Sequence, residues 1–62
     1  MNLKLTRIKN NLTQKELALL VGVSNVTIVK MEKEGPDSVK FGTLKKIAEV
    51  LNSSIEELFL DQ

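Results

Sequence analysis

The chain has 62 residues, of which 42% are hydrophobic, so the composition fits one small globular domain rather than a disordered segment. It contains no cysteine and no histidine, which excludes disulfides, zinc fingers and catalysis through a thiol or an imidazole. A core of this size is marginal, so stability must come from apolar packing, helix caps or a partner subunit. We expect a single domain over 1–62 with no metal, no cofactor, no small-molecule ligand and no enzymatic activity.

Charge is distributed unevenly along the chain, although the net charge is only +1. Residues 1–33 carry six cations and two carboxylates (+4), whereas residues 34–62 carry three cations and six carboxylates (−3). This asymmetry suggests one surface for a polyanion and another for a different partner, but an ordinary solvated surface explains it equally well. Charges also interrupt the apolar residues at the N-terminus, unlike a signal peptide or membrane span, so we expect a cytoplasmic protein without a membrane partner.

The first two predicted elements are short helices. The first ends at Asn10 and Asn11, because asparagine tolerates the left-handed conformation that terminates a helix. The second begins at Thr13, which forms the T-x-x-E pattern of a capping box with Glu16, and it ends at Gly22. Its apolar side on a helical wheel is made of Leu17, Ala18, Leu20 and Val21.

The run VGVSNVTIVKME at 21–32 is ambiguous, because its five β-branched apolar residues favour a strand. A lone strand would have no partner among the neighbouring helices, and Ser24 is a good N-cap following a glycine turn. On a wheel, Ile28 and Met31 share a side that can join a core, so a helix is favoured. The opposite side carries Asn25, Val26, Val29, Lys30 and Lys33.

Two further helices are predicted after a loop. Residues 34–38 (EGPDS) form a turn, because Gly-Pro stops a preceding helix. Residues 41–52 carry apolar side chains at helical spacing and end at Asn52, and a last helix opens on a second capping box, Ser54 with Glu57. The sequence therefore predicts an all-α protein of five short helices joined by tight turns.

The outward side of the third helix suggests nucleic-acid recognition. Valine and asparagine have lower helix propensity than the usual surface residues, whereas an amide can pair with adenine, a lysine with guanine or phosphate, and a small apolar group with a thymine methyl. The residues alone do not separate this interpretation from one in which Val26 and Val29 pack against a neighbouring helix or a partner chain.

Residues 12–32 resemble the helix-turn-helix of the lambda-repressor-like family, also called the Xre or Cro family. The similarity covers roughly 3–59, and it implies a compact five-helix bundle with the helix-turn-helix at about 13–33. The family's function implies a transcriptional regulator that binds double-stranded DNA. The matching residues are Leu12-Thr13-Gln14, Leu17-Ala18, Gly22-Val23-Ser24, Ile28 and Glu32.

The resemblance also implies roles for individual residues, because in this family the second helix crosses the DNA backbone and the third enters the major groove. Base contacts are expected from Asn25, Val26, Thr27 and Lys30. Phosphate contacts are expected from Thr13, Gln14, Lys33 and Lys40. Arg7 and Glu32 are expected to form a partly buried ion pair between the first and third helices. Many relatives cap the fourth helix with a serine, whereas this sequence offers Lys40, so a weak cap is expected there.

Short members of the family often dimerise through their last two helices, which here span about 41–60. The candidate interface residues are Ile55, Phe59 and Leu60. A homodimer would place two recognition helices ~34 Å apart on a near-palindromic operator, and the exposed Glu34 is a candidate contact for RNA polymerase. The resemblance fits a small phage-type repressor or a restriction-modification controller protein. The alternative is a protein-interaction module of the same fold, such as an antitoxin or a coactivator-like protein.

Overall fold

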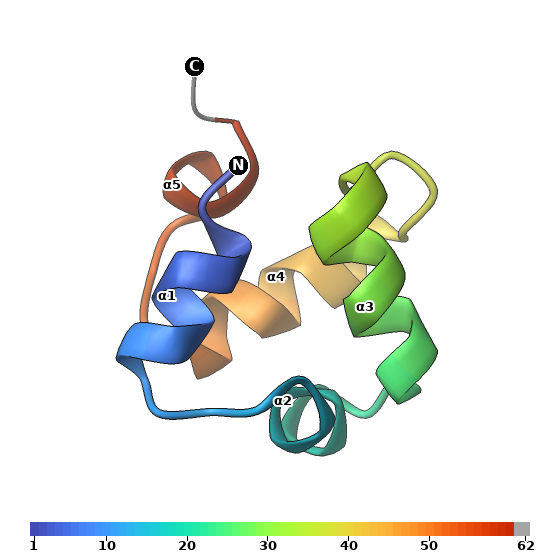
Figure 1. The fold of residues 1–62 in the computed structure, drawn as a ribbon. Coiled ribbons are helices and arrows are strands. Elements are labelled where there is room, and N and C mark those ends of the chain that lie inside the picture. Colours follow the sequence, from blue (N-terminus) through green and yellow to red (C-terminus); the bar gives the residue numbers. More distant parts are fainter. Residues whose placement is uncertain (61–62) are drawn as a thin grey trace.

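Five short helices make up the regular structure of residues 1–60, which are the residues that the computed structural model describes. The predicted all-α fold is confirmed, and Figure 1 shows the arrangement. Asp61 and Gln62, the end of the predicted domain, lie outside the described residues. The helices are α1 (Leu3–Lys9), α2 (Gln14–Val21), α3 (Asn25–Glu34), α4 (Phe41–Val50) and α5 (Ile55–Phe59).

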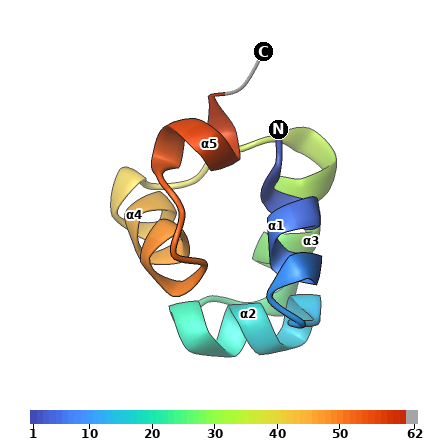
Figure 2. The ribbon, with the colours of Figure 1, turned by 90° about the vertical axis from the view of Figure 1, so that its left-hand side faces the viewer.

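The helices pack around one core. Helix α2 lies against α3 and α4, while α5 lies against α4 and α1. Figures 1 and 2 both place α2 at one end of the molecule and α5 at the opposite end. Six large side chains fill the centre with less than 2% of their surface exposed: Leu3, Leu17, Ile28, Met31, Ile47 and Leu58.

The ambiguous run at 21–32 forms a turn followed by a helix. Gly22 adopts a left-handed conformation with φ 88°, and its N–H donates to the carbonyl of Ala18 at 2.8 Å. The Ser24 hydroxyl then accepts the backbone N–H of Thr27 at 3.2 Å, which caps α3. The β-branched residues are therefore accommodated in a helix, because local caps and core contacts outweigh their strand propensity.

Both predicted capping boxes are present. Thr13 Oγ1 accepts the Glu16 N–H at 3.0 Å, and the Glu16 carboxylate accepts the Thr13 N–H at 2.8 Å. Ser54 and Glu57 make the same reciprocal pair at the start of α5. Lys40 provides no side-chain cap for α4, as the departure from the family pattern led us to expect.

The predicted apolar side of α2 is wrong at Leu20, which is 54% exposed. Leu17 and Ala18 are buried, and Val21 packs partly against the core. At 100° per residue, Leu20 lies about 100° from the middle of the side formed by those three residues, so it falls at the edge of the interface. Within residues 1–60, no helix is both long and apolar enough to cross a membrane.

Candidate nucleic-acid interface

Helices α2 and α3 are joined by a three-residue turn, residues 22–24. A left-handed residue is needed at the end of α2 to redirect the chain, and glycine adopts it without a Cβ penalty. The Val23 N–H also donates to the Ala18 carbonyl, at 3.0 Å, which closes the end of α2. Two packed helices with this short connection have the geometry of a helix-turn-helix.

Helix α3 is anchored on one side and exposed on the other. Ile28 and Met31 are almost completely buried, at 0% and 1% exposed, and fix the helix to the core. Val26 is 72% exposed, so it does not pack against a neighbouring helix of its own chain. Asn25 and Lys30 are exposed on the same helix. The predicted base-contacting row is therefore available on the surface, apart from Thr27, which is half-buried.

A groove of about 490 Å³ runs between α3 and the beginning of α4. It brings three of the predicted base-contacting residues beside Lys40, a predicted phosphate contact. Val23 and Val39 also line this surface, which the sequence did not predict, because only the packing of α4 near the helix-turn-helix places them there. The side chains that line the groove include Val23, Val26, Thr27, Lys30, Val39 and Lys40.

Thr27 is tied to the start of its own helix. Its hydroxyl lies 3.0 Å from the Ser24 hydroxyl, so the two side chains share a hydrogen bond. One lone pair or proton of Thr27 is therefore used within the protein, while the side chain still lines the groove.

The Gln14 side chain differs from the expected free phosphate ligand. Gln14 Nε2 donates to Glu32 Oε1 at 3.0 Å, so the amide joins α2 to α3. Its carboxamide is half-buried as a result. The backbone N–H groups of Gln14 and Lys15 have no acceptor within the helix because they lie in its first turn. Unpaired N–H groups at the start of a helix can bind an anion such as a phosphate.

Arg7 and Glu32 form the expected ion pair. Arg7 Nε donates to Glu32 Oε2 at 2.6 Å, and the two side chains are only 9% and 5% exposed. A second guanidinium nitrogen of Arg7 donates to the Leu12 carbonyl at 2.7 Å, directly before the cap of α2. Arg7 therefore fixes α1, the α1–α2 connection and α3 in one arrangement.

The predicted phosphate contacts other than Gln14 lie at the surface. Thr13, Lys33 and Lys40 are exposed. Within residues 1–60, none of the lysines of α3 or at the start of α4 is engaged in an ion pair. Their charges are therefore not neutralised by the protein and are available to an external anion.

The three candidate dimer residues differ in accessibility. Phe59 belongs to the core with 7% of its surface exposed, and Ile55 packs partly against that core. Leu60 is 62% exposed. Helix α5 is so short that its buried face uses most of its apolar side chains, which leaves Leu60 as the accessible member of this set.

This fold and surface define the class of helix-turn-helix proteins, and comparison with known proteins agrees. Residues 3–58 match the family model described as helix-turn-helix. Two relatives from Archaeoglobus fulgidus are each 46% identical over 54 residues, which is 87% of this chain and 75% and 76% of theirs. Both are described as uncharacterized HTH-type transcriptional regulators. No solved structure matches the chain significantly. The chain belongs to the helix-turn-helix family, of the Xre and Cro type, a family of DNA-binding proteins.

Proposed function

We propose that this protein is a transcriptional regulator that recognises a specific double-stranded DNA sequence by placing α3 in the major groove. The observation that supports this most strongly is the division of α3 into two sides. Ile28 and Met31 anchor the helix, while Asn25, Val26 and Lys30 remain exposed without partners in the core. A helix held rigidly by one side presents the other in a fixed orientation, which base recognition requires.

The exposed row has the chemistry of base edges. The Asn25 amide can donate to and accept from adenine, the Val26 methyl groups can contact a thymine methyl, and the Lys30 ammonium can donate to guanine O6 and N7. Thr27 lies in the same groove and contributes its hydroxyl to a base or a phosphate.

Phosphate contacts flank this row on both sides. The first amides of α2 and the Thr13 hydroxyl lie at one end of the helix-turn-helix, and Lys40 lies across the groove from α3. Lys33 extends the positive charge along α3. Contacts of this kind fix the register of the protein on the duplex without specifying sequence.

A homodimer on a near-palindromic operator follows from this proposal. One α3 contacts only a few base pairs, and a two-fold dimer doubles the recognised sequence. The regulator then acts by occupying its operator, as a small phage-type repressor or a restriction-modification controller would. Contact with RNA polymerase through the exposed Glu34 would allow the regulator to activate transcription. DNA binding also implies that the protein works in the cell compartment that holds the DNA.

Selection of binding sites from random duplexes, followed by titration at several salt concentrations, tests the proposal. We expect a near-palindromic consensus and an affinity that falls steeply as salt rises, because phosphate contacts release counterions. Binding without sequence preference would contradict sequence-specific recognition.

A protein-interaction module is the alternative function, and one surface favours it. Leu19 and Leu20 are adjacent on α2 and are 75% and 54% exposed. Adjacent exposed leucines form an apolar patch, and such patches are typical of surfaces that bind another protein. Absence of any DNA binding in the titration would support this alternative.

A further inference from the structure

The start of α2 is attached to the rest of the protein on both sides of its cap. Before the cap, the Leu12 carbonyl accepts a hydrogen bond from Arg7 Nη1 at 2.7 Å. After the cap, Gln14 Nε2 donates to Glu32 Oε1 at 3.0 Å. Thr13 lies between these two attachments and caps the helix with its own hydroxyl. The first turn of α2 is therefore fixed by side chains of α1 and α3.

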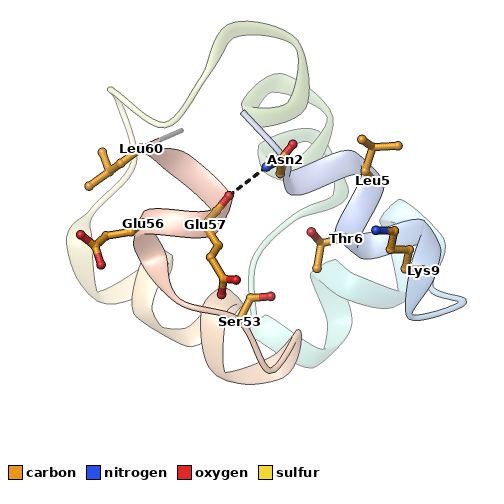
Figure 3. Close-up of a pocket in the computed structure, with 8 residues that line it drawn as sticks. All are labelled: Asn2, Leu5, Thr6, Lys9, Ser53, Glu56, Glu57 and Leu60. Atoms are coloured by element: carbon orange, nitrogen blue, oxygen red, sulfur yellow. Dashed lines mark hydrogen bonds between the residues drawn. The ribbon is translucent and has the colours of Figure 1, made fainter. Parts of the chain in front are cut away.

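Both attachments lead to one ion pair. Arg7 Nε donates to Glu32 Oε2 at 2.6 Å, and Arg7 Nη2 donates to Glu32 Oε1 at 3.3 Å. The two side chains are almost completely buried, so these bonds are stronger than they would be in water. Helix α1, which carries Arg7, is tied down at its other end as well, where Asn2 Nδ2 donates to the Glu57 carbonyl at 3.3 Å (Figure 3). The ion pair is therefore a fixed support for the start of α2.

Gln14 provides the direct link between the start of α2 and α3. The peptide connection between these helices, residues 22–24, leaves the opposite end of α2, about 10 Å away along the helix axis. Glu32 lies four residues after Ile28, which anchors α3 in the core. The hydrogen bond from Gln14 to Glu32 therefore holds the first turn of α2 at a set distance from α3.

We propose that Gln14 is a positioning residue, which sets the place of the first turn of α2 relative to α3 and acts without binding DNA itself. The inference rests on the proposed function, in which the first amides of α2 bind a phosphate while α3 contacts bases. These two contacts must match the fixed geometry of a duplex at the same time. A hydrogen bond to a buried carboxylate is both strong and directional, so it suits this task.

A positioning role affects DNA binding differently from a direct phosphate contact. A phosphate contact contributes equally to every sequence, because all duplexes carry the same backbone. The spacing between α2 and α3 matters chiefly on the operator, where phosphate and base contacts form together. On unrelated DNA, no base contacts have to be aligned. Loss of the Gln14 bond should therefore weaken operator binding more than binding to unrelated DNA.

Gln14→Met tests this difference, because it removes the amide donor and keeps an unbranched side chain of the same length. We expect the dissociation constant for the selected operator to rise about tenfold, through loss of one hydrogen bond to a charged group. The constant for an unrelated duplex should change by less than about twofold. Fluorescence anisotropy at one salt concentration measures both constants.

Ile47→Val is the control for a general loss of stability. Ile47 is a buried residue of α4, so the change weakens the core without touching Glu32. This variant should leave the ratio of the two dissociation constants at the parent value.

Gln14→Glu tests the contact with Glu32 in the absence of DNA. The new carboxyl group would face Glu32 Oε1, while Arg7 already pairs with the same carboxylate. Two facing carboxylates repel, so the folded variant should hold a proton between them at a pH where the unfolded chain has lost it. Its stability relative to the parent should therefore rise as the pH falls from about 8 to 5. Gln14→Met adds no titratable group, so its urea midpoint relative to the parent should stay constant with pH.

Equal losses of affinity for operator and unrelated DNA in Gln14→Met would mean that the side chain binds phosphate itself, and unaltered binding would mean that it has no role. Either result would overturn the proposal. A relative stability of Gln14→Glu that does not depend on pH would overturn the contact with Glu32. The pH test needs no DNA, so a parent chain that binds all duplexes equally would contradict the proposed function and not this contact.

Discussion

Glu32 connects three parts of the protein through one carboxylate. Oε2 accepts the short bond from Arg7, while Oε1 accepts from both Arg7 and Gln14. The group belongs to α3, yet it faces α1 and the start of α2 and not the groove beside Lys40. Its role at the residue scale is to hold the helix-turn-helix together.

Glu32→Ala should therefore destabilise the fold. Removing one partner from a buried ion pair typically costs about 3–5 kcal/mol, because Arg7 would remain buried without its counter-charge. The midpoint of urea denaturation measures this loss. The double variant Arg7→Leu/Glu32→Leu should lose less than Glu32→Ala, since it leaves no unpaired charge. An unchanged midpoint in Glu32→Ala would contradict the structural role.

Lys30 and Lys33 differ in their expected effects on DNA binding, although both are exposed lysines of α3. Lys30 lines the groove beside Val26, so Lys30→Ala should relax base preference at one position by about 1–3 kcal/mol. Lys33→Ala should weaken all sequences similarly and lower the salt slope by about one. Competition binding to operators that differ at single base pairs distinguishes the two variants. Identical base preferences in Lys30→Ala and Lys33→Ala would contradict the assignment of Lys30 to a base and Lys33 to a phosphate.

At the scale of elements, glycine conformation determines the connection between α2 and α3. Gly22 has φ 88°, and an added Cβ would meet no atom within 4 Å. The cost of Gly22→Ala is therefore a backbone cost, about 1–2 kcal/mol for a left-handed alanine.

Gly42 provides the matched control for Gly22. It lies inside α4, where an added Cβ also meets nothing within 4 Å. Gly42→Ala should stabilise the protein by about 0.5–1 kcal/mol, because alanine has the higher helix propensity. The midpoint of thermal denaturation should therefore fall for Gly22→Ala and rise for Gly42→Ala. A higher midpoint for Gly22→Ala would contradict the left-handed turn at this position.

Lys40 has two conflicting roles at the start of α4. It occupies the N-cap position in extended conformation but makes no capping bond, while its charge lies at the groove beside α3. Lys40→Ser should stabilise the protein by about 1 kcal/mol through a new cap. The same change should weaken DNA binding at all sequences, because a phosphate contact is lost. Parallel denaturation and binding titrations measure the two effects, and unaltered DNA affinity would remove Lys40 from the interface.

At the scale of the whole molecule, the proposed homodimer would hold two α3 helices at a fixed spacing and would thereby limit the operator. Half-sites whose centres are one turn apart, about 10 base pairs, should bind the dimer most tightly. Inserting about 5 base pairs rotates one half-site to the opposite face of the duplex and should abolish cooperative binding. Gel-shift titration of duplexes with different spacers measures this, and insensitivity to spacing would mean that two monomers bind independently.

The charge asymmetry of the sequence does not correspond to two faces of the molecule. Lys4 and Lys9 lie on α1, which Figure 1 places on the side away from α3. Lys40, from the acidic half of the chain, lies beside α3 instead. The division of the sequence into a basic and an acidic half therefore does not predict which charged residues lie beside α3.

The sequence by itself determined the helices and their limits. Both capping boxes, the Ser24 cap and the left-handed Gly22 act over a few residues, so short patterns were sufficient to predict them. The same holds for the outward row of α3, because helical periodicity places Ile28 and Met31 opposite Val26.

Only the tertiary structure decided which distant side chains meet. Gln14 and Glu32 are 18 positions apart, and the hydrogen bond from the Asn2 side chain to the Glu57 carbonyl spans 55 positions. Leu20 was misplaced for the same reason, since burial depends on which helix lies opposite and not on local spacing. The groove beside Lys40, which belongs to the surface that we assign to DNA, arises where α4 packs near the helix-turn-helix.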